Sequence, residues 1–309
     1  METDFLFKIA SNREAQQFLA GKPAVLRHVY DQMIPEIQAR LFTVGLLETF
    51  DGIQRVRDLV ADVPAGGDWN QTKKDIAAEF SPYLVDPDAD KETQAKQRAA
   101  ADAKAELVLR TNAFDASDAT QTAALEKQKA VMPYWQWHTM GDERVRSSHA
   151  ALDGKAFPAD SEFWQRQKEW GCRCYKTALS QGDVDEIKDA DADKPPGEQR
   201  VLEGAALRDA ERGFIQVSPA QAAEINPNNV EWREHQHDLV PDVPVTVNIN
   251  KNARFRSTPL NDTGLRIPLE SLRGKYDAVT WSIFMETARN VELGGGRTLL
   301  DWLSGTHGA

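Results

Sequence analysis

The chain contains 309 residues, with 37 Lys and Arg against 48 Asp and Glu, so its formal net charge is −11. Its length accommodates about two domains of average size, and a hydrophobic fraction of 41% is that of an ordinary globular protein. The acidic excess excludes a protein that coats DNA with a basic surface, and two cysteines separated by one residue exclude a disulfide-rich secreted scaffold.

The amino terminus carries acidic residues where a secretory signal needs basic ones, and no apolar segment follows them. No stretch of the sequence approaches the roughly 18 apolar residues that a membrane-spanning helix requires. We therefore expect a protein that is made in a reducing cytoplasm and has no membrane partner.

The amino-terminal part of the chain has helical patterns. Between residues 24 and 61, apolar side chains recur at intervals of three and four, and Pro35 is expected to divide or kink the helix. Another helix is expected over residues 68–80. Residues 93–131 are rich in Ala, Glu, Lys and Gln, which predicts two helices with an interruption at residues 112–120.

The central part mixes strand and helix signals. Residues 134–139 alternate aromatic and polar side chains, which predicts a strand with Trp135 and Trp137 on one face. Asp142 is expected to cap a helix that ends near Leu152. A second strand is expected from Cys172 onwards, so that a compact mixed α/β unit results.

The remainder of the chain changes character twice. Six acidic residues between positions 183 and 193, followed by Lys-Pro-Pro-Gly, predict a solvated linker. Residues 243–250 alternate with a period of two, which predicts a strand, and residues 276–293 have a more helical pattern. Residues 240–309 carry 8 basic and 7 acidic side chains against 29 and 41 in residues 1–239, so the net charges are +1 and −12.

These patterns predict an α+β protein with four parts. They are a helical amino-terminal arm region, a compact mixed α/β central unit, an acidic and proline-containing linker region, and a short β-containing carboxy-terminal tail (residues 1–125, 126–180, 181–239 and 240–309, respectively).

Two cysteines and a histidine form the candidate metal site. In a strand, the sulfurs of Cys172 and Cys174 would point to the same face and could bind one ion together with His149. His138 or Asp142 is the candidate fourth ligand. Zinc sites usually separate paired cysteines by roughly two to four residues, so this spacing favours instead two buried thiols with a hydrogen-bonded histidine. Both interpretations stay open, and zinc is the candidate cofactor.

Other unusual residues of the central unit have structural explanations. On a helix, positions 142, 146 and 149 share a face, which predicts an ion pair between Asp142 and Arg146 over His149. The four tryptophans of this unit are expected to form its core rather than a surface on which nucleic-acid bases stack. They are Trp135, Trp137, Trp164 and Trp170.

The same residues form a longer motif. It reads Trp-x-Trp-x-Thr-x-x-Asp-x-Arg-Val-Arg-x-x-His-x-x-Leu-x-Gly, followed by Phe-Trp and Gly-Cys-Arg-Cys, and it resembles the signature of the phage Mu F-like minor head proteins, also called phage head morphogenesis proteins. The resemblance covers about residues 95–180. The matching positions are Trp137, Thr139, Asp142, Arg144, Arg146, His149, Leu152, Gly154, Cys172, Arg173 and Cys174.

The resemblance implies a structural protein, and no catalytic activity follows from it, so we expect neither an enzyme nor, zinc apart, a cofactor. Its members are minor capsid components of tailed phages or prophages, present in few copies and associated with the portal vertex during procapsid assembly. The implied partners are the portal protein and the major capsid protein, with the scaffold as a further one, and some members influence DNA packaging or ejection. The implied location is the virion head, after assembly in the host cytoplasm.

Two alternatives remain from other functional classes. The first is a carrier of a metal-supported nuclease or toxin, because His149, Cys172 and Cys174 could bind a metal and some relatives carry a toxin after this module. The second is contact with DNA through basic residues of the tail, which are Arg254, Arg256, Arg266 and Arg273.

Overall fold

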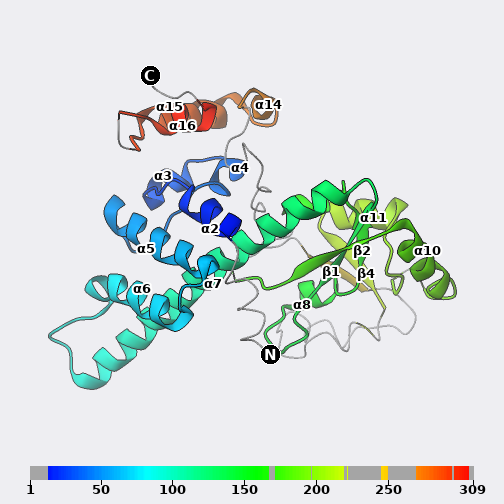
Figure 1. Cartoon of the computed structure of the whole chain (residues 1–309), viewed down its shortest axis with the longest axis horizontal. Helices are drawn as coiled ribbons and strands as arrows, with labels where there is room; N and C mark the ends of the chain where they lie inside the picture. The colour runs from blue at the N-terminus through cyan, green and yellow to red at the C-terminus, as the bar shows by residue number, and fades with distance from the viewer. Residues whose placement is uncertain are drawn as a thin grey trace. The chain divides into compact units, whose positions relative to one another are not determined.

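The computed structural model describes residues 13–166, 171–195, 197–218, 221, 245–249, 269–293 and 296–305. The chain divides into two compact units, one formed by residues 1–123 with 257–309 and the other by residues 124–256. In Figure 1 the first unit runs from blue through cyan to green and again from orange to red, and the second unit runs from green to yellow. Helices form the first unit and two small sheets lie in the second, so the predicted α+β class is confirmed.

The amino-terminal helices of the first unit share one core, to which Phe18, Phe42, Ile53 and Phe80 contribute. Side-chain caps begin the longer helices, since the N–H of Gln71 donates to Asp68 at 2.6 Å. The elements are α2 (Arg13–Ala20), α3 (Arg27–Asp31), α4 (Pro35–Gln38), α5 (Phe50–Asp62), the 3-10 helix η1 (Val63–Ala65), α6 (Trp69–Leu84) and α7 (Lys91–Gln128).

The segment 24–61 is divided into more pieces than the predicted two helices or single kinked helix. It forms α3, α4 and α5, and Pro35 begins α4 at a first-turn position where its missing N–H leaves no helical hydrogen bond unmade. The apolar periodicity still marks the core, because Val29, Met33 and Ile37 are all buried. The pattern therefore predicted burial correctly and helix continuity incorrectly.

Helix α7 runs without a break through residues 112–120, where an interruption was predicted. The polar side chains that suggested the break bond back to the helix: Asn112 Nδ2 donates to the carbonyl of Val108 at 2.8 Å, and Thr120 Oγ1 donates to that of Ala116 at 2.9 Å. Alanines between them are buried and permit close packing. Tertiary packing therefore overrides the local preference of these residues for turns.

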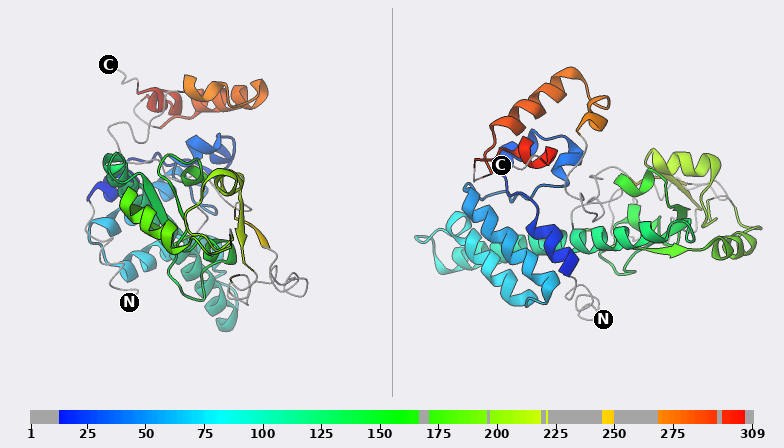
Figure 2. Two further views of the ribbon diagram at one scale, coloured as in Figure 1. Left: turned by 90° about the vertical axis from the view of Figure 1, so that its right-hand side faces the viewer. Right: turned by 45° about the horizontal axis from the view of Figure 1, so that its top comes forward.

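The described part of the tail contains three helices, α14 (Glu270–Arg273), α15 (Ala278–Asn290) and α16 (Leu299–Ser304). Helix α15 confirms the helical pattern predicted over residues 276–293, and it lies beside α16 (Figure 2). Both pack against the segment that contains α3 and α4, where Phe284 and Leu303 join Ile37 in one buried cluster. The Tyr276 hydroxyl donates to the Glu36 carboxylate across this contact.

A three-stranded antiparallel sheet organises the second unit, with strand order β2-β1-β3. Its strands are β1 (Tyr134–His138), β2 (Ala156–Pro158) and β3 (Tyr175–Leu179). Strand β1 is the predicted first strand, and Trp135 and Trp137 are each 1% exposed on its inner face. The second predicted strand begins later than expected, because Gly171 to Cys174 form an irregular approach to β3.

The remaining elements of this unit are α8 (Ser147–Ala150), α9 (Phe163–Arg166), α10 (Gln181–Ala190), α11 (Gly204–Glu211), β4 (Phe214–Val217) and β5 (Val245–Asn248). Strands β4 and β5 pair antiparallel, and β5 confirms the strand predicted over residues 243–250. Among the described residues, no helix has both the length and the hydropathy that crossing a bilayer would require.

Helix α10 forms the first half of residues 181–200, the acidic part of the region predicted to be a linker, and α11 and β4 lie further along the same region. Ser180 and Asp183 form a reciprocal capping box, in which the Ser180 hydroxyl accepts from the N–H of Asp183 at 3.2 Å. Val184 is fully buried against Ala156 and Val201. A cap and buried apolar contacts thus accompany helix formation in a sequence whose overall composition is that of a linker.

Candidate functional site

Trp137 joins the sheet to the rest of the candidate site. Its ring is buried and meets the His149 ring edge-on, with the centroids 5.6 Å apart and the planes at 90°. The rings of Phe163 and Trp164 lie on its other sides, at 5.8 and 6.3 Å. The aromatic core therefore fixes the orientation of the histidine, and the prediction that these tryptophans are core residues is confirmed for the three that the structure describes; Trp170 lies outside the described residues.

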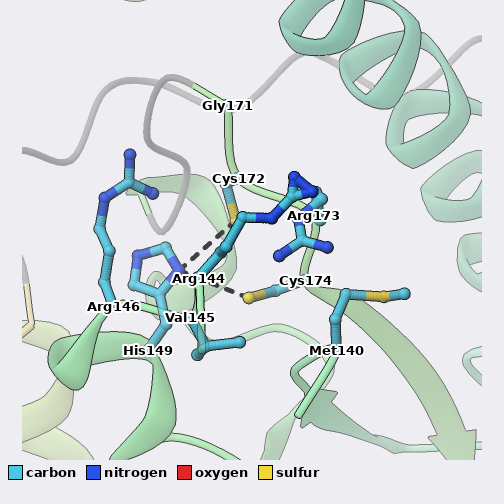
Figure 3. A pocket seen from close by; sticks show the side chains of 9 residues that line it. All are labelled: Met140, Arg144, Val145, Arg146, His149, Gly171, Cys172, Arg173 and Cys174. Atoms are coloured by element: carbon cyan, nitrogen blue, oxygen red, sulfur yellow. Dashed lines mark hydrogen bonds between the residues drawn. The ribbon is translucent and has the colours of Figure 1, made fainter. Parts of the chain in front are cut away.

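His149, Cys172 and Cys174 come together, as the sequence analysis proposed. His149 Nδ1 lies 3.5 Å from Cys172 Sγ and 3.4 Å from Cys174 Sγ, and the three side chains are buried. One ligand atom from each lies within 4.8 Å of the others. Figure 3 shows the imidazole directed at both sulfurs. The arrangement is that of a compact nitrogen–sulfur cluster on the wall of a pocket.

The pocket beside this cluster has a volume of about 20 Å³, which is room for one water molecule or ion. Arginine side chains surround it and make it basic in a chain that is acidic overall (Figure 3). Its lining residues are Met140, Arg144, Val145, Arg146, His149, Gly171, Cys172, Arg173 and Cys174.

Asp142 pairs with Arg173 and not with the predicted Arg146. Its carboxylate accepts a 2.6 Å hydrogen bond from Arg173 Nη2 and a 3.1 Å bond from the N–H of Arg144. The hydrogen bond from Arg173 lowers the pKa of the Asp142 carboxyl. The predicted helix from Asp142 was wrong, because residues 142–146 form a turn and α8 begins at Ser147.

Neither residue expected as a fourth ligand joins the cluster. Asp142 is occupied by Arg173, and His138 Nε2 lies 2.8 Å from Thr177 Oγ1 while its ring stacks on Tyr175. Burial lowers the pKa of His138. Within the described part of the chain, the cluster therefore offers three candidate ligands.

The remaining motif residues hold the backbone around β1. The N–H of Thr139 donates to Asp153 Oδ1 at 2.6 Å, and the N–H of Gly154 donates to the carbonyl of Trp137 at 2.9 Å. Gly154 has a φ of +74°, a left-handed conformation that disfavours any residue with a Cβ atom. Leu152 is fully buried in the aromatic core.

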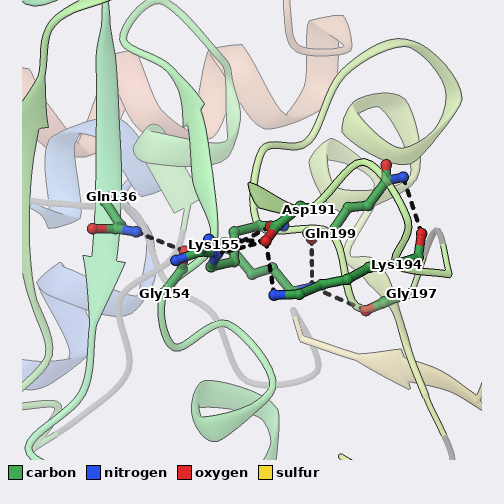
Figure 4. A network of polar contacts seen from close by, with 8 residues as sticks. Gln136, Gly154, Lys155, Asp191, Lys194, Gly197 and Gln199 are labelled. Carbon is green, nitrogen blue, oxygen red and sulfur yellow. Dashed lines mark hydrogen bonds and ion pairs between the residues drawn. The ribbon is translucent and has the colours of Figure 1, made fainter. Parts of the chain in front are cut away.

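A buried lysine, Lys155, directly follows the motif residue Gly154 and was not predicted from the sequence. Lys155 is 2% exposed, and its Nζ donates to the carbonyls of Gly197 and Gln199 at 2.9 and 2.7 Å (Figure 4). Burial lowers the pKa of Lys155 to about 8. The sequence offers little signal for this, since a lysine after a turn glycine reads as a surface residue.

Asp191 belongs to the network of polar contacts around Lys155. It is 3% exposed and pairs with Lys194 at 2.7 Å and Arg200 at 2.8 Å. Burial raises the pKa of the Asp191 carboxyl, but the hydrogen bonds from Arg200 and Lys194 outweigh it, so the net pKa is lowered. This network closes the segment after α10 over Lys155 (Figure 4).

A second buried lysine was also missed. Lys176 on β3 is fully buried, and its Nζ lies 5.3 Å from the Trp135 ring centroid and 5.9 Å from that of Trp164. Both distances are within the range of cation–π contacts. Strand alternation could have found it, because Lys176 is the register partner of Trp137 and therefore lies across from it on the sheet.

The structure describes one of the four candidate DNA-binding arginines of the tail. Arg254, Arg256 and Arg266 lie outside the described residues. Arg273 is the last residue of α14.

Comparison with known proteins confirms the resemblance that the motif suggested. Residues 61–177 match the family described as Phage Mu protein F like protein. Over 77 residues the chain is 40% identical to the Mu-like prophage FluMu F protein of Haemophilus influenzae, which covers 24% of this chain and 19% of that protein. Over 186 residues it is 25% identical to the putative capsid assembly protein F of Escherichia phage Mu, covering 57% and 42%.

The chain thus spans less than half the length of either of these relatives. No solved structure matches it significantly. The matched family region begins in α5 and ends in β3, so it contains every motif residue from Trp137 to Cys174.

Proposed function

Because residues 61–177 are a Phage Mu protein F-like region, we propose that the chain takes part in assembling the head of a tailed phage or prophage. The observation that carries this proposal is the similarity to the putative capsid assembly protein of phage Mu, which extends over 57% of the chain. The virion head is then the final location of the protein, and the host cytoplasm is where it is assembled.

The proposed place of action is the portal vertex of the procapsid. The portal protein is the first proposed partner, and the major capsid protein and the scaffold are further ones. The net charge of −12 over residues 1–239 supports protein partners, because packaged DNA is itself a polyanion. From this position the protein would influence DNA packaging or ejection.

We propose that the chain acts without catalysis. The cluster of His149, Cys172 and Cys174 contains no carboxylate among the described residues, and the nearby Asp142 is paired with Arg173. In a metal-supported nuclease the metal ion itself can activate water, but a general base must also accept the proton, and the Asp142 carboxylate is already held by Arg173. Incubation of the full chain with DNA and divalent metal should leave the DNA intact, whereas chelator-sensitive cleavage would favour the nuclease.

The assembly proposal is tested by sedimentation. The full chain is mixed with procapsids of its own phage assembled either with or without portal protein, and bound copies are counted by quantitative mass spectrometry. We expect binding in few copies, and to the portal-containing shells alone. Equal binding to both shells would move the contact to the major capsid protein, and binding to neither would overturn the proposal.

A direct DNA partner is tested with the same material. Binding through tail arginines predicts an affinity for DNA that falls steeply as salt rises. If the chain does not bind DNA at low salt, DNA is not a partner of the tail, and other proteins are its expected partners.

A further inference from the structure

The interatomic distances in the cluster of His149, Cys172 and Cys174, and not only its residue types, indicate what it can bind. A neutral imidazole nitrogen has either one lone pair or one hydrogen, so it makes one well-aligned hydrogen bond. Here two sulfurs approach the same Nδ1 almost equally, at 3.5 and 3.4 Å. A histidine nitrogen can bond well to only one of two thiols, whereas a single cation between the three atoms would contact all of them.

The separations match the edges of a zinc tetrahedron. An ion about 2.1 Å from nitrogen and about 2.3 Å from each sulfur, at tetrahedral angles, places nitrogen about 3.6 Å from sulfur and the sulfurs about 3.8 Å apart. The two nitrogen–sulfur distances agree with these edges, and all three atoms lie within 4.8 Å. The two nitrogen–sulfur edges therefore already have the length that a bound zinc ion requires.

The local backbone explains why a Cys-x-Cys spacing works here. Gly171 has a φ of +70°, and after this turn the chain approaches β3 without regular secondary structure. Both sulfurs reach the same imidazole from this short stretch, as they would from alternate positions of a strand. His149 comes from α8, and Trp137 holds its ring edge-on. The spacing that argued against zinc in the sequence is thus compatible with it in the fold.

The charges around the cluster suit thiolate ligands. Arg144, Arg146 and Arg173 line the pocket, and neighbouring cations favour the deprotonated thiol that binds metal. Two thiolates cancel the charge of a divalent ion, so the complete centre would be neutral. Arg173 is already compensated by Asp142, which limits the repulsion that an incoming cation meets.

We propose that His149 Nδ1, Cys172 Sγ and Cys174 Sγ bind one Zn²⁺ ion and that a solvent molecule from the adjoining pocket completes its coordination. Nitrogen and sulfur donors in tetrahedral arrangement select zinc among the common biological metals. The ion would tie the segment before β3 to α8 and so stabilise the unit formed by residues 124–256. This proposal does not depend on the role in head assembly.

The first test measures metal content. The full chain is purified under reducing conditions from zinc-supplemented cells and analysed by elemental mass spectrometry, with the expectation of one zinc per chain. Cys172→Ser/Cys174→Ser and His149→Gln should reduce the content to background. His138→Gln is the matched control, because His138 lies in the same unit and bonds Thr177 outside the cluster; it should keep the full zinc content.

The second test needs no variant and therefore does not depend on whether the variants fold. Chelator treatment of the wild-type chain should make both thiols react faster with a disulfide reagent, and added Zn²⁺ should reverse this. X-ray absorption of the zinc-loaded chain should show two sulfur ligands. Zinc-free wild type that takes up no Zn²⁺, a metal without sulfur ligands, or equal zinc loss in His138→Gln would each overturn the proposal.

Discussion

The carboxylate of Asp142 accepts a 2.6 Å hydrogen bond from Arg173, the residue that separates the two cysteines. The pair joins the turn after β1 to the segment before β3, and Arg173 lines the same pocket as His149. Arg173 is 9% exposed while Asp142 is 36% exposed, so the guanidinium is the more strongly desolvated partner. A buried cation is costly once its counter-charge is removed.

Replacement of Asp142 by Asn should therefore lower the free energy of unfolding of the second unit by about 1–3 kcal/mol. The loss arises because the Arg173 guanidinium stays buried while its charged acceptor is gone. Chemical denaturation monitored by tryptophan fluorescence measures the change. Glu162→Gln is the control, since it removes one exposed carboxylate from the same unit and should change stability by less than about 0.5 kcal/mol.

A double-mutant cycle with Arg173→Met isolates the pair itself. The double variant should be more stable than the sum of the two single losses predicts, because removal of both charges leaves no unpaired ion. Strictly additive losses would show that Asp142 and Arg173 are not coupled.

Gly154 gives a second prediction, based on backbone conformation. Its φ of +74° disfavours a side chain, although the nearest atom to an added Cβ is Arg200 Cδ at 4.0 Å. Gly154→Ala should thus destabilise the unit by about 1–2 kcal/mol through strain alone. Gly182→Ala, in the first turn of α10, should be neutral or stabilise by up to about 1 kcal/mol. Equal effects of both substitutions on the denaturation midpoint would contradict this reasoning.

The sequence predicted the parts of the central unit whose signals are local. Alternation identified β1 and the inward direction of Trp135 and Trp137, and the motif identified the residues that surround the cluster. The approach of His149 to both cysteines was also anticipated, although 23 and 25 residues separate them. Strand spacing suggested that the two sulfurs share a face, and His149 was included because of its residue type; the cysteines turned out to precede the strand.

The features that sequence reasoning missed depend on contacts distant along the chain. Continuity of α7 through residues 112–120 relies on buried alanines and on hydroxyls that bond to their own helix. Lys155 is buried because carbonyls more than 40 residues later accept its hydrogen bonds. The partner of Asp142 was predicted from helical spacing, and that inference failed because the segment forms a turn. Local periodicity contains no information on these partners.

Phe284 gives a third prediction, for the first unit. It is fully buried where α15 meets the segment that contains α3 and α4, so Phe284→Ala should cost about 3–5 kcal/mol. Amide hydrogen exchange should accelerate at least about a hundredfold in α15 and α3 where exchange proceeds through unfolding of this unit. Val279→Ala, on the same helix but 69% exposed, is the control and should leave exchange nearly unchanged. Slow exchange in Phe284→Ala would mean that this packing contributes little.

Lys155 gives the fourth prediction, a rise of stability at alkaline pH. Burial lowers the pKa of Lys155 to about 8 in the folded chain, against 10.5 for an ordinary lysine. Between these values the folded state has lost the proton that the unfolded state still binds, so the free energy of unfolding must increase with pH. The full increase is on the order of 3 kcal/mol, and it is complete once pH exceeds the ordinary lysine pKa.

Comparison with Lys155→Met isolates this contribution, because all other groups that titrate in the same range are present in both proteins. Urea denaturation from pH 7 to pH 11 should show wild-type stability rising relative to that of the variant. At neutral pH the two proteins also differ in stability for a second reason, because Met leaves the carbonyls of Gly197 and Gln199 without their hydrogen-bond donor. The difference between the two curves is therefore the measured quantity. A difference that stays constant across pH 8 to 10.5 would show that the Lys155 ammonium is not destabilised by burial.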